Sequence, residues 1–436
     1  MSNGTHAAPS VKNKVINPNK TLNMKTALCA VLILLFQNMA DAQTNQRFLY
    51  KTGVVDSIYS ETLKEYRQIY IQLPESYNPA NGQKYPTAYI LDGETLLPTA
   101  SIVQGFYSGG FFPEMILIGI SNRKHRTRDL IPSKINTKYG MPFNEENGQA
   151  AKFFTFLKEE LIPYVESKYR VTNYRTLIGH SYGGLFAIYT LINHPQLFAN
   201  YLAIDPSLDW DNQKLLKQAG TVLAKGDFKG KSLYMSLNGQ LDMQNSHVTL
   251  ENVMQDTTYF TLFARSNISF ANLVKKNQEC GLTFRWEFFP DDLHGTIALP
   301  SIRSGLISLF KWFQMEKTDR FNSPDTPKEE LYRIIKYRAN KLSSHFGYKV
   351  PPYPEDLINM MGYMSLNMGQ PEKAKMFFAF GIEYYPEKPN VYDSMADYYI
   401  AQKDTINALK FVKKAFELSG RDYYKKRMEK FDTKNE

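Results

Sequence analysis

The sequence predicts a chain in two parts, an α/β sheet domain with helices on both faces of the sheet and a small all-α segment after it. Continuous apolar runs such as residues 115–120 are typical of strands buried on both faces of a parallel sheet. Helical periodicity, as at residues 153–169, separates these runs, and strands that alternate with helices favour a parallel sheet. Beyond residue 320 the sequence has helical periodicity and no convincing strand.

The composition sets the broad class of protein. With 436 residues, 43% of them hydrophobic and 22% charged, the chain is long enough for two folded domains. The net charge is +9, but the Lys and Arg residues are scattered and no nucleic-acid-binding motif accompanies them. We therefore predict a solvated basic surface and no nucleic-acid partner.

Residues 1–42 are expected to precede the folded protein. A basic start at Met24, a short apolar run at residues 27–36 and a small-residue site that ends at Ala42 are together typical of a secretory signal peptide. The apolar run is shorter than the roughly 20 residues that span a bilayer, so no membrane span is expected. We predict an exported protein that is cleaved after Ala42, with Met24 favoured over Met1 as the start.

The chain has two cysteines. Cys29 lies within the predicted signal peptide and would be removed with it, which leaves Cys280 alone. We therefore predict no intrachain disulfide and a structural role for the Cys280 thiol.

The predicted α/β domain covers residues 43–318. Residues 66–73 alternate between polar and apolar types and end at Pro74, which predicts an early antiparallel strand. The later strands are shorter or more continuously apolar, as expected inside a parallel sheet. Their predicted ranges are 86–91, 115–120, 175–178, 201–204, 232–237 and 283–289.

A turn-rich linker, residues 322–327, leads to a predicted helical domain at residues 328–436. Similar residues recur there 34 positions apart, and a helix-turn-helix period of this length resembles the tetratricopeptide repeat. Two copies are few for an independent solenoid, so we expect this domain to pack on the first and to offer a surface for a protein partner. A plain helical extension is the alternative. The recurring pairs are Gly362 and Ala396, Gly369 and Lys403, and Ala374 and Ala408.

The main functional signal is the pentapeptide Gly179-His180-Ser181-Tyr182-Gly183. A Gly-x-Ser-x-Gly pattern often occurs by chance, but here a predicted strand enters it and a predicted helix leaves it. In that setting the small residues permit a sharp turn that presents the serine hydroxyl at the carboxyl end of the sheet, next to a helix N-terminus. We therefore predict that Ser181 is a nucleophile.

A nucleophilic serine needs a base, and the acid that orients this base is expected between the two in sequence. His294 is the predicted base, because it follows the last predicted strand in a loop that would bring it over the nucleophile. Asp242 is the favoured acid, because it follows the preceding strand, residues 232–237. A pair of Ser181 and His294 without a fixed acid stays open. The other candidates for the acid are Glu251, Asp256, Asp291 and Asp292.

Two backbone N–H groups are expected to form an oxyanion hole. One belongs to Tyr182, the residue after the nucleophile, and the other to Gly93 or Glu94 in a loop after an early strand. An ordinary tight turn at Asp92-Gly93 is the alternative.

Five segments form an ordered set along the chain: Arg67-x-Ile69-x-Ile71-x-Leu73-Pro74, Tyr89-Ile90-Leu91-Asp92-Gly93, Asn122-Arg123…Arg126…Asp129-Leu130-x-Pro132, Gly179-His180-Ser181-Tyr182-Gly183-Gly184 and Asp292-x-His294-Gly295. Together they resemble the esterase-D and enterochelin-esterase branch of the α/β-hydrolases, over roughly residues 47–315. The resemblance implies an α/β-hydrolase fold with Ser181 as nucleophile and His294 as base, whereas the acid does not carry over cleanly. Members with a tetratricopeptide-like tail resemble exported proteins of Bacteroidetes-type bacteria, which implies the periplasm, with an extracellular location as the alternative.

The sequence thus predicts a serine esterase that hydrolyses carboxylic esters through an acyl-enzyme. The resemblance implies siderophore esters or acylated polysaccharides as substrates, and Arg123 and Arg126 are candidate contacts for an anionic one. We expect no cofactor and no metal, because no His, Asp and Glu cluster has the spacing of metal ligands. The alternatives are a non-catalytic hydrolase scaffold that docks a partner through its helical tail, and a peptidase or acyltransferase that uses the same acyl-enzyme.

Overall fold

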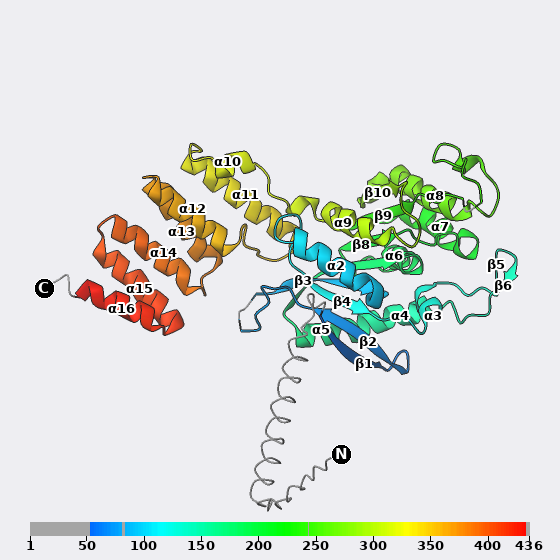
Figure 1. Ribbon diagram of the computed structural model, residues 1–436, viewed down its shortest axis with the longest axis horizontal. Coiled ribbons are helices and arrows are strands. Elements are labelled where there is room, and N and C mark those ends of the chain that lie inside the picture. The colour runs from blue at the N-terminus through cyan, green and yellow to red at the C-terminus, as the bar shows by residue number, and fades with distance from the viewer. Residues whose placement is uncertain (1–52, 81–82, 243, 433–436) are drawn as a thin grey trace, which may run out of the picture. The chain divides into compact units, whose positions relative to one another are not determined.

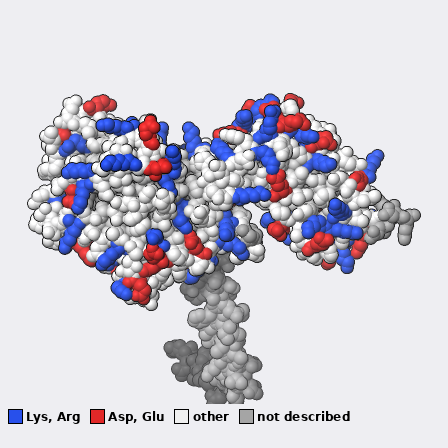
Figure 2. Space-filling model, turned by 180° about the vertical axis from the view of Figure 1, so that it is seen from behind, with Lys and Arg blue, Asp and Glu red and all other residues white. Residues whose placement is uncertain are grey.

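The computed structural model describes residues 53–80, 83–242 and 244–432. The predicted signal peptide, its cleavage site and Cys29 lie outside these residues, whereas Cys280 is buried as a free thiol. Within the described ranges, no helix has the length and apolar character needed to cross a membrane. Figure 2 shows Lys and Arg side chains interspersed with Asp and Glu over the visible face.

The first part of the described chain is organised by an eight-stranded sheet (Figure 1). Its strands are β1 Val54–Ser60, β2 Glu65–Gln72, β3 Tyr85–Leu91, β4 Ile116–Ile120, β7 Val171–His180, β8 Asn200–Ile204, β9 Ser232–Asn238 and β10 Thr283–Phe289. They lie in the order β1-β2-β4-β3-β7-β8-β9-β10. β2 pairs antiparallel with both β1 and β4, and the other neighbours are parallel, as predicted.

The seven strands predicted from the sequence are confirmed, within a few residues at their ends. β1 was not predicted, because its more buried positions hold Asp56, Ile58 and Ser60, of which only Ile58 is apolar. The small hairpin of β5 Thr137–Lys138 and β6 Met141–Pro142 was not predicted either, because strands of two residues have no periodicity to detect.

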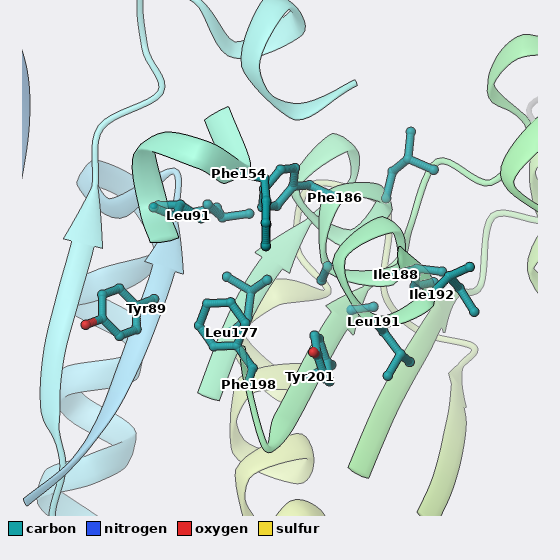
Figure 3. Packing of buried hydrophobic residues seen from close by; sticks show 14 of the residues in the cluster. Tyr89, Leu91, Phe154, Leu177, Phe186, Ile188, Leu191, Ile192, Phe198 and Tyr201 are labelled. Carbon is teal, nitrogen blue, oxygen red and sulfur yellow. The ribbon is translucent and has the colours of Figure 1, made fainter. Parts of the chain in front are cut away.

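Helices cover both faces of the sheet, as predicted (Figure 1). They are α2 Gly93–Tyr107, α3 Arg126–Leu130, α4 Ala150–Phe156, α5 Ile162–Lys168, α6 Tyr182–Asn193, α7 Trp210–Leu223, α8 Leu262–Lys276 and α9 Ala298–Leu309. Tyr89 and Leu91 of β3 contribute to one buried cluster with α4 to α8, whereas Ala88 and Ile90 contribute to a second cluster with α2 and α9. Figure 3 shows side chains of the first cluster, several of them from α6.

After β10 the described residues form helices and no further strand. The C-terminal helices are α10 Thr318–Asn322, α11 Lys328–Phe346, α12 Glu355–Asn367, α13 Pro371–Tyr384, α14 Pro389–Ala401, α15 Thr405–Ser419 and α16 Asp422–Asp432. α12 and α14 begin 34 residues apart, and so do α13 and α15, which matches the spacing of the sequence pattern. Gly369 and Lys403, both at positive φ, lie in the two corresponding turns. The segment therefore contains two similar helical hairpins, and their assignment as tetratricopeptide repeats stays a prediction.

The last turn of α11 packs against the sheet domain. Phe346 shares a buried cluster with Tyr174 of β7, and their ring centroids are 5.0 Å apart. His345 stacks on Trp312, which follows α9, at 4.2 Å between ring centroids. α11 therefore completes part of the core on the face of the sheet that α2 and α9 cover.

Candidate active site

Ser181 alone forms the turn between β7, which ends at His180, and α6, which begins at Tyr182. Its backbone has φ 59° and ψ −113°, a combination that is unfavourable for a residue with a side chain. A Cβ on Gly179 would lie 2.3 Å from the carbonyl oxygen of Gly183. Glycine is therefore needed at position 179 for the strand and the helix to approach this closely.

The segment after β8 holds Ser181 in place. The Ser181 N–H donates to the carbonyl oxygen of Ile204 at 2.9 Å, and the Ser207 N–H donates to the Ser181 carbonyl oxygen at 3.2 Å. Ser181 Oγ lies 3.3 Å from Ser207 Oγ. The Ser181 residue is partly exposed, so its hydroxyl is both positioned and accessible to a ligand.

His294 lies in the loop after β10, as predicted, and its Nδ1 is 2.5 Å from Oδ2 of Asp205. Asp205 is fully buried directly after β8. The Asn238 N–H donates to Asp205 Oδ1 at 3.2 Å, and Asn238 Nδ2 donates to Oδ2 at 2.5 Å. A carboxylate bound to Nδ1 orients the imidazole ring and leaves Nε2 to exchange a proton.

This hydrogen bond corrects the prediction that Asp242 orients His294. Asp242 Oδ1 instead accepts hydrogen bonds from the N–H groups of Gln244 and Asn245, at 2.7 and 3.1 Å. Asp205 occupies the position beside the imidazole, so a pair without a fixed acid does not describe the site either. The other candidates bond within their own loops or are exposed: Glu251, Asp256, Asp291 and Asp292.

Asp205 is not among the predicted acids, because the acid was expected after β9. The residue at the end of β9 is Asn238, whose side-chain amide donates a hydrogen bond to the Asp205 carboxylate. A signal was present: Asp205 directly follows the predicted strand 201–204, and the carboxyl ends of parallel strands meet at one edge of a sheet. Its φ of 45° is a second unusual feature, which only the structure shows.

A second helix also begins at this edge of the sheet. β3 and β7 are neighbours, and α2 begins at Gly93 just after β3, as α6 begins at Tyr182 just after β7. A Cβ on Gly93 would lie 2.5 Å from backbone atoms of Gly119, so α2 can start here only with glycine. The first N–H groups of a helix have no partner inside it. The N–H groups of Tyr182 and of Gly93 or Glu94 therefore fit an oxyanion hole, and this role stays a prediction.

Arg126 joins the two segments that carry these N–H groups. Its Nε and Nη2 donate to the two carboxylate oxygens of Asp92 at 2.9 and 3.0 Å, and Nη2 also donates to the His180 carbonyl oxygen at 3.0 Å. Its charge is therefore balanced by Asp92, which favours a positioning role over a direct substrate contact. Arg123 is exposed in the turn before α3. That either arginine binds substrate stays a prediction.

His180 lies against the catalytic candidates, with its ring centroid 4.6 Å from that of His294. Burial, together with the charges of His294 and Arg126, lowers the pKa of His180 to about 4.

In the described chain, potential ligand atoms of His180, Asp205 and His294 lie within 4.8 Å of one another. Since Asp205 is already bonded to His294 and Asn238, this arrangement fits a hydrogen-bonded acid, and we assign no metal to it.

Residues 60–252 match the protein-family model "Esterase", described as "Putative esterase". The matched segment is esterase-like. It includes Ser181 and Asp205 and ends before His294. Together with the sheet order and the strained serine turn, the match identifies the sheet domain as α/β-hydrolase-like in fold.

Two curated relatives are similar to part of this chain. The siderophore enterobactin esterase of Emericella nidulans is 31% identical over 186 residues, which cover 39% of this chain and 59% of that protein. The ferri-bacillibactin esterase BesA of Bacillus subtilis is 33% identical over 166 residues, which cover 34% of this chain and 56% of that protein. The chain thus spans just over half the length of these two relatives.

A solved structure with a similar fold is that of an IroE-like serine hydrolase from Shewanella oneidensis. It superposes with a TM-score of 0.62 at 28% sequence identity, covering 76% of this chain and 99% of that one. This likeness extends over nearly the whole of the Shewanella protein and agrees with an α/β-hydrolase-like fold.

Proposed function

We propose that this protein is a serine esterase that hydrolyses carboxylic esters through an acyl-enzyme. The observation that carries the proposal is the arrangement at the carboxyl edge of the sheet. Ser181 stands on a strained turn at the N-terminus of α6, and His294 is bonded through Nδ1 to the buried Asp205. The similarity of residues 60–252 to esterases supports the same reaction class.

In the first half of the proposed reaction, Ser181 Oγ attacks the carbonyl carbon of the ester while His294 Nε2 accepts the hydroxyl proton. Asp205 stabilises the positive charge that develops on the imidazole. The carbonyl oxygen becomes negatively charged and accepts hydrogen bonds from the N–H groups of Tyr182 and of Gly93 or Glu94. His294 then donates its proton to the departing alcohol, which leaves the acyl group on Ser181.

In the second half, a water molecule attacks the carbonyl carbon of the acyl-enzyme. His294 accepts a proton from this water, and the same N–H groups receive the oxyanion. Collapse of the intermediate releases the carboxylic acid, and His294 returns the proton to Ser181 Oγ. Each residue thus acts twice, and the site returns to its starting state.

For the substrate class we propose ester-containing siderophores. The support is that the two curated relatives are described as esterases of siderophores, enterobactin in one and ferri-bacillibactin in the other. Acylated polysaccharides, which the sequence resemblance also implies, have no corresponding support among these relatives.

The test compares the full chain with its Ser181→Ala variant on 4-nitrophenyl acetate, 4-nitrophenyl butyrate and a triester siderophore. We expect the variant to lose about 10⁴-fold or more in kcat, because the nucleophile is essential to the acyl-enzyme route. Ser167→Ala, an exposed serine in α5, serves as the matched control and should retain activity. Equal activity of the wild type and Ser181→Ala would refute the proposal. Absence of activity on every ester would favour a non-catalytic binding protein.

A further inference from the structure

Lys138 is a half-buried cation beside the proposed nucleophile turn. Its Nζ lies 3.3 Å from the hydroxyl oxygen of Tyr182, the residue that follows Ser181. Arg126, the other cation over the Tyr182 ring, is paired with Asp92. Within residues 53–80, 83–242 and 244–432, no carboxylate forms such an ion pair with Lys138. No ion-pair partner in the described part of the chain therefore neutralises the positive charge of Lys138.

Aromatic rings surround the Lys138 ammonium group. Nζ lies 5.1 Å from the ring centroid of Tyr139 and 5.3 Å from those of Tyr182 and Trp210. Ring faces attract a cation and displace part of its water, but they do not use up its hydrogen-bond donors. An ammonium group has three donors, and the described contacts of Lys138 engage one of them. The group can thus donate to a further acceptor that arrives with a ligand.

The β5–β6 hairpin holds Lys138 in this position. Tyr139 and Gly140, its two turn residues, have φ of 51° and 79°, and positive φ is strained for a bulky residue such as tyrosine. Two contacts offset this strain. The Tyr139 hydroxyl donates to the buried carboxylate of Asp209, and the Tyr139 ring stacks on Tyr259 at 5.9 Å between centroids. Burial and the charge of Asp209 raise the pKa of Tyr139, so its hydroxyl stays protonated as a donor.

We propose that Lys138 is an anion subsite of the esterase, which selects esters that carry an anionic oxygen, a carboxylate or a phenolate, near the scissile carbonyl group. This inference rests on the proposed function and adds a substrate property to it. The fixed hairpin presents the ammonium group beside Tyr182, whose N–H is proposed to bind the oxyanion. The surrounding rings of Tyr139, Tyr182 and Trp210 suit an aromatic or aliphatic portion of the same substrate.

The experiment uses two esters with the same leaving group and chain length, mono(4-nitrophenyl) adipate and 4-nitrophenyl hexanoate. They differ only in ending with a carboxylate or a methyl group. We expect Lys138→Met to lower the ratio of kcat/KM for adipate to that for hexanoate by about tenfold, the usual order for a charge-assisted hydrogen bond. Lys138→Arg, which keeps the charge, should retain most of the preference.

Lys134→Met removes an exposed lysine just before the same hairpin and serves as the matched control, with an expected change in the ratio of less than about twofold. In the wild type the ratio should also fall as NaCl is raised, because salt screens the attraction between charges. An equal ratio in wild type and Lys138→Met, or a ratio in the wild type that does not respond to salt, would overturn the subsite and leave the esterase standing. If the wild type hydrolyses neither these esters nor the others tested, the proposed function falls and the subsite falls with it.

Discussion

At Asp205 the observed site differs most from the site that the sequence predicts. It is buried, it accepts two hydrogen bonds from Asn238, and it bonds to Nδ1 of His294. If Asp205 orients the base, Asp205→Asn should lower kcat for 4-nitrophenyl butyrate by about 10²–10⁴-fold, because an amide stabilises neither the required tautomer nor the imidazolium ion. Steady-state kinetics measure this loss.

Asp242→Asn is the control for that substitution, because Asp242 was the predicted acid and, among the described residues, its carboxylate accepts hydrogen bonds from backbone N–H groups of its own loop. We expect its kcat to stay within about twofold of the wild type. A large loss for Asp242→Asn with little loss for Asp205→Asn would reverse the assignment.

The three members of the proposed triad differ in how far the sequence reveals them. Ser181 lies in a local pattern of glycines between a strand and a helix, and His294 follows the last strand, so both can be found by reading along the chain. Asp205 is recognisable only after the sheet brings the ends of β8, β9 and β10 together. The pairing of β8 with β9, rather than any feature near residue 205, places the acid beside the base.

His180 predicts how the stability of the protein depends on pH. Burial lowers the pKa of His180 from the usual value of about 6.5 to about 4 in the folded protein, so the unfolded chain binds more protons between these pH values. The free energy of unfolding should therefore fall as the pH is lowered from 6.5 to 4, by up to about 3 kcal/mol from this residue. Urea denaturation at a series of pH values measures the slope.

His180→Gln should flatten this part of the pH dependence, since glutamine does not titrate. His247→Gln changes an exposed histidine and should leave the slope as it is in the wild type. An unchanged slope in His180→Gln would mean that other groups cause the acid sensitivity.

At the level of elements, the start of α2 depends on the absence of a side chain at Gly93. A Cβ there would lie 2.5 Å from the backbone of Gly119 in β4, so Gly93→Ala must move the helix away from the sheet. We expect a loss of about 1–3 kcal/mol in the free energy of unfolding, as for other overpacked positions, together with a lower kcat. Urea denaturation and ester kinetics measure the two effects.

Gly105→Ala in the same helix is the matched substitution. Gly105 is exposed and no atom lies within 4 Å of its added Cβ, so alanine should stabilise the helix by about 0.5–1 kcal/mol. If both substitutions changed the free energy of unfolding and kcat in the same way, the close approach of α2 to β4 would not be the reason that position 93 requires glycine.

The elements that the sequence analysis missed share a physical cause. β1 is an edge strand whose more buried positions hold Asp56, Ile58 and Ser60, so its sequence shows no alternation of apolar and polar residues to detect. The β5–β6 hairpin has a tyrosine where a hairpin turn usually has asparagine or glycine. Contacts of Tyr139 with Asp209 and Tyr259 stabilise that turn, and these contacts exist only in the folded chain.

At the level of the whole molecule, the helical segment and the sheet domain share core residues at the end of α11. Phe346 is 4% exposed and lies 5.0 Å, between ring centroids, from both Tyr174 and Trp312. Phe346→Ala should lower the free energy of unfolding by about 3–5 kcal/mol, the range for removal of a buried aromatic ring. Tyr337→Ala, on the exposed face of the same helix, should change it by less than about 0.5 kcal/mol.

A single unfolding transition that shifts as a whole in Phe346→Ala would mean that α11 and the sheet domain unfold together. An unshifted transition for the sheet domain would contradict the shared core.

The order of these parts was predictable, because the strand pattern stops before residue 320 and a 34-residue period follows. The contact between them was not, since Tyr174 and Phe346 are far apart in sequence and neither lies in a recognisable motif.

The central claim is that Ser181 is the nucleophile of an ester hydrolase. The most direct measurement is the intact mass of the protein after incubation with an alkyl fluorophosphonate, which reacts with activated serines, followed by peptide mapping. The account predicts one adduct per chain, located on Ser181, and loss of ester hydrolysis in proportion to labelling. It also predicts no adduct in Ser181→Ala. Ester hydrolysis that persists in fully labelled protein, or an adduct on another residue that abolishes it, would contradict the claim.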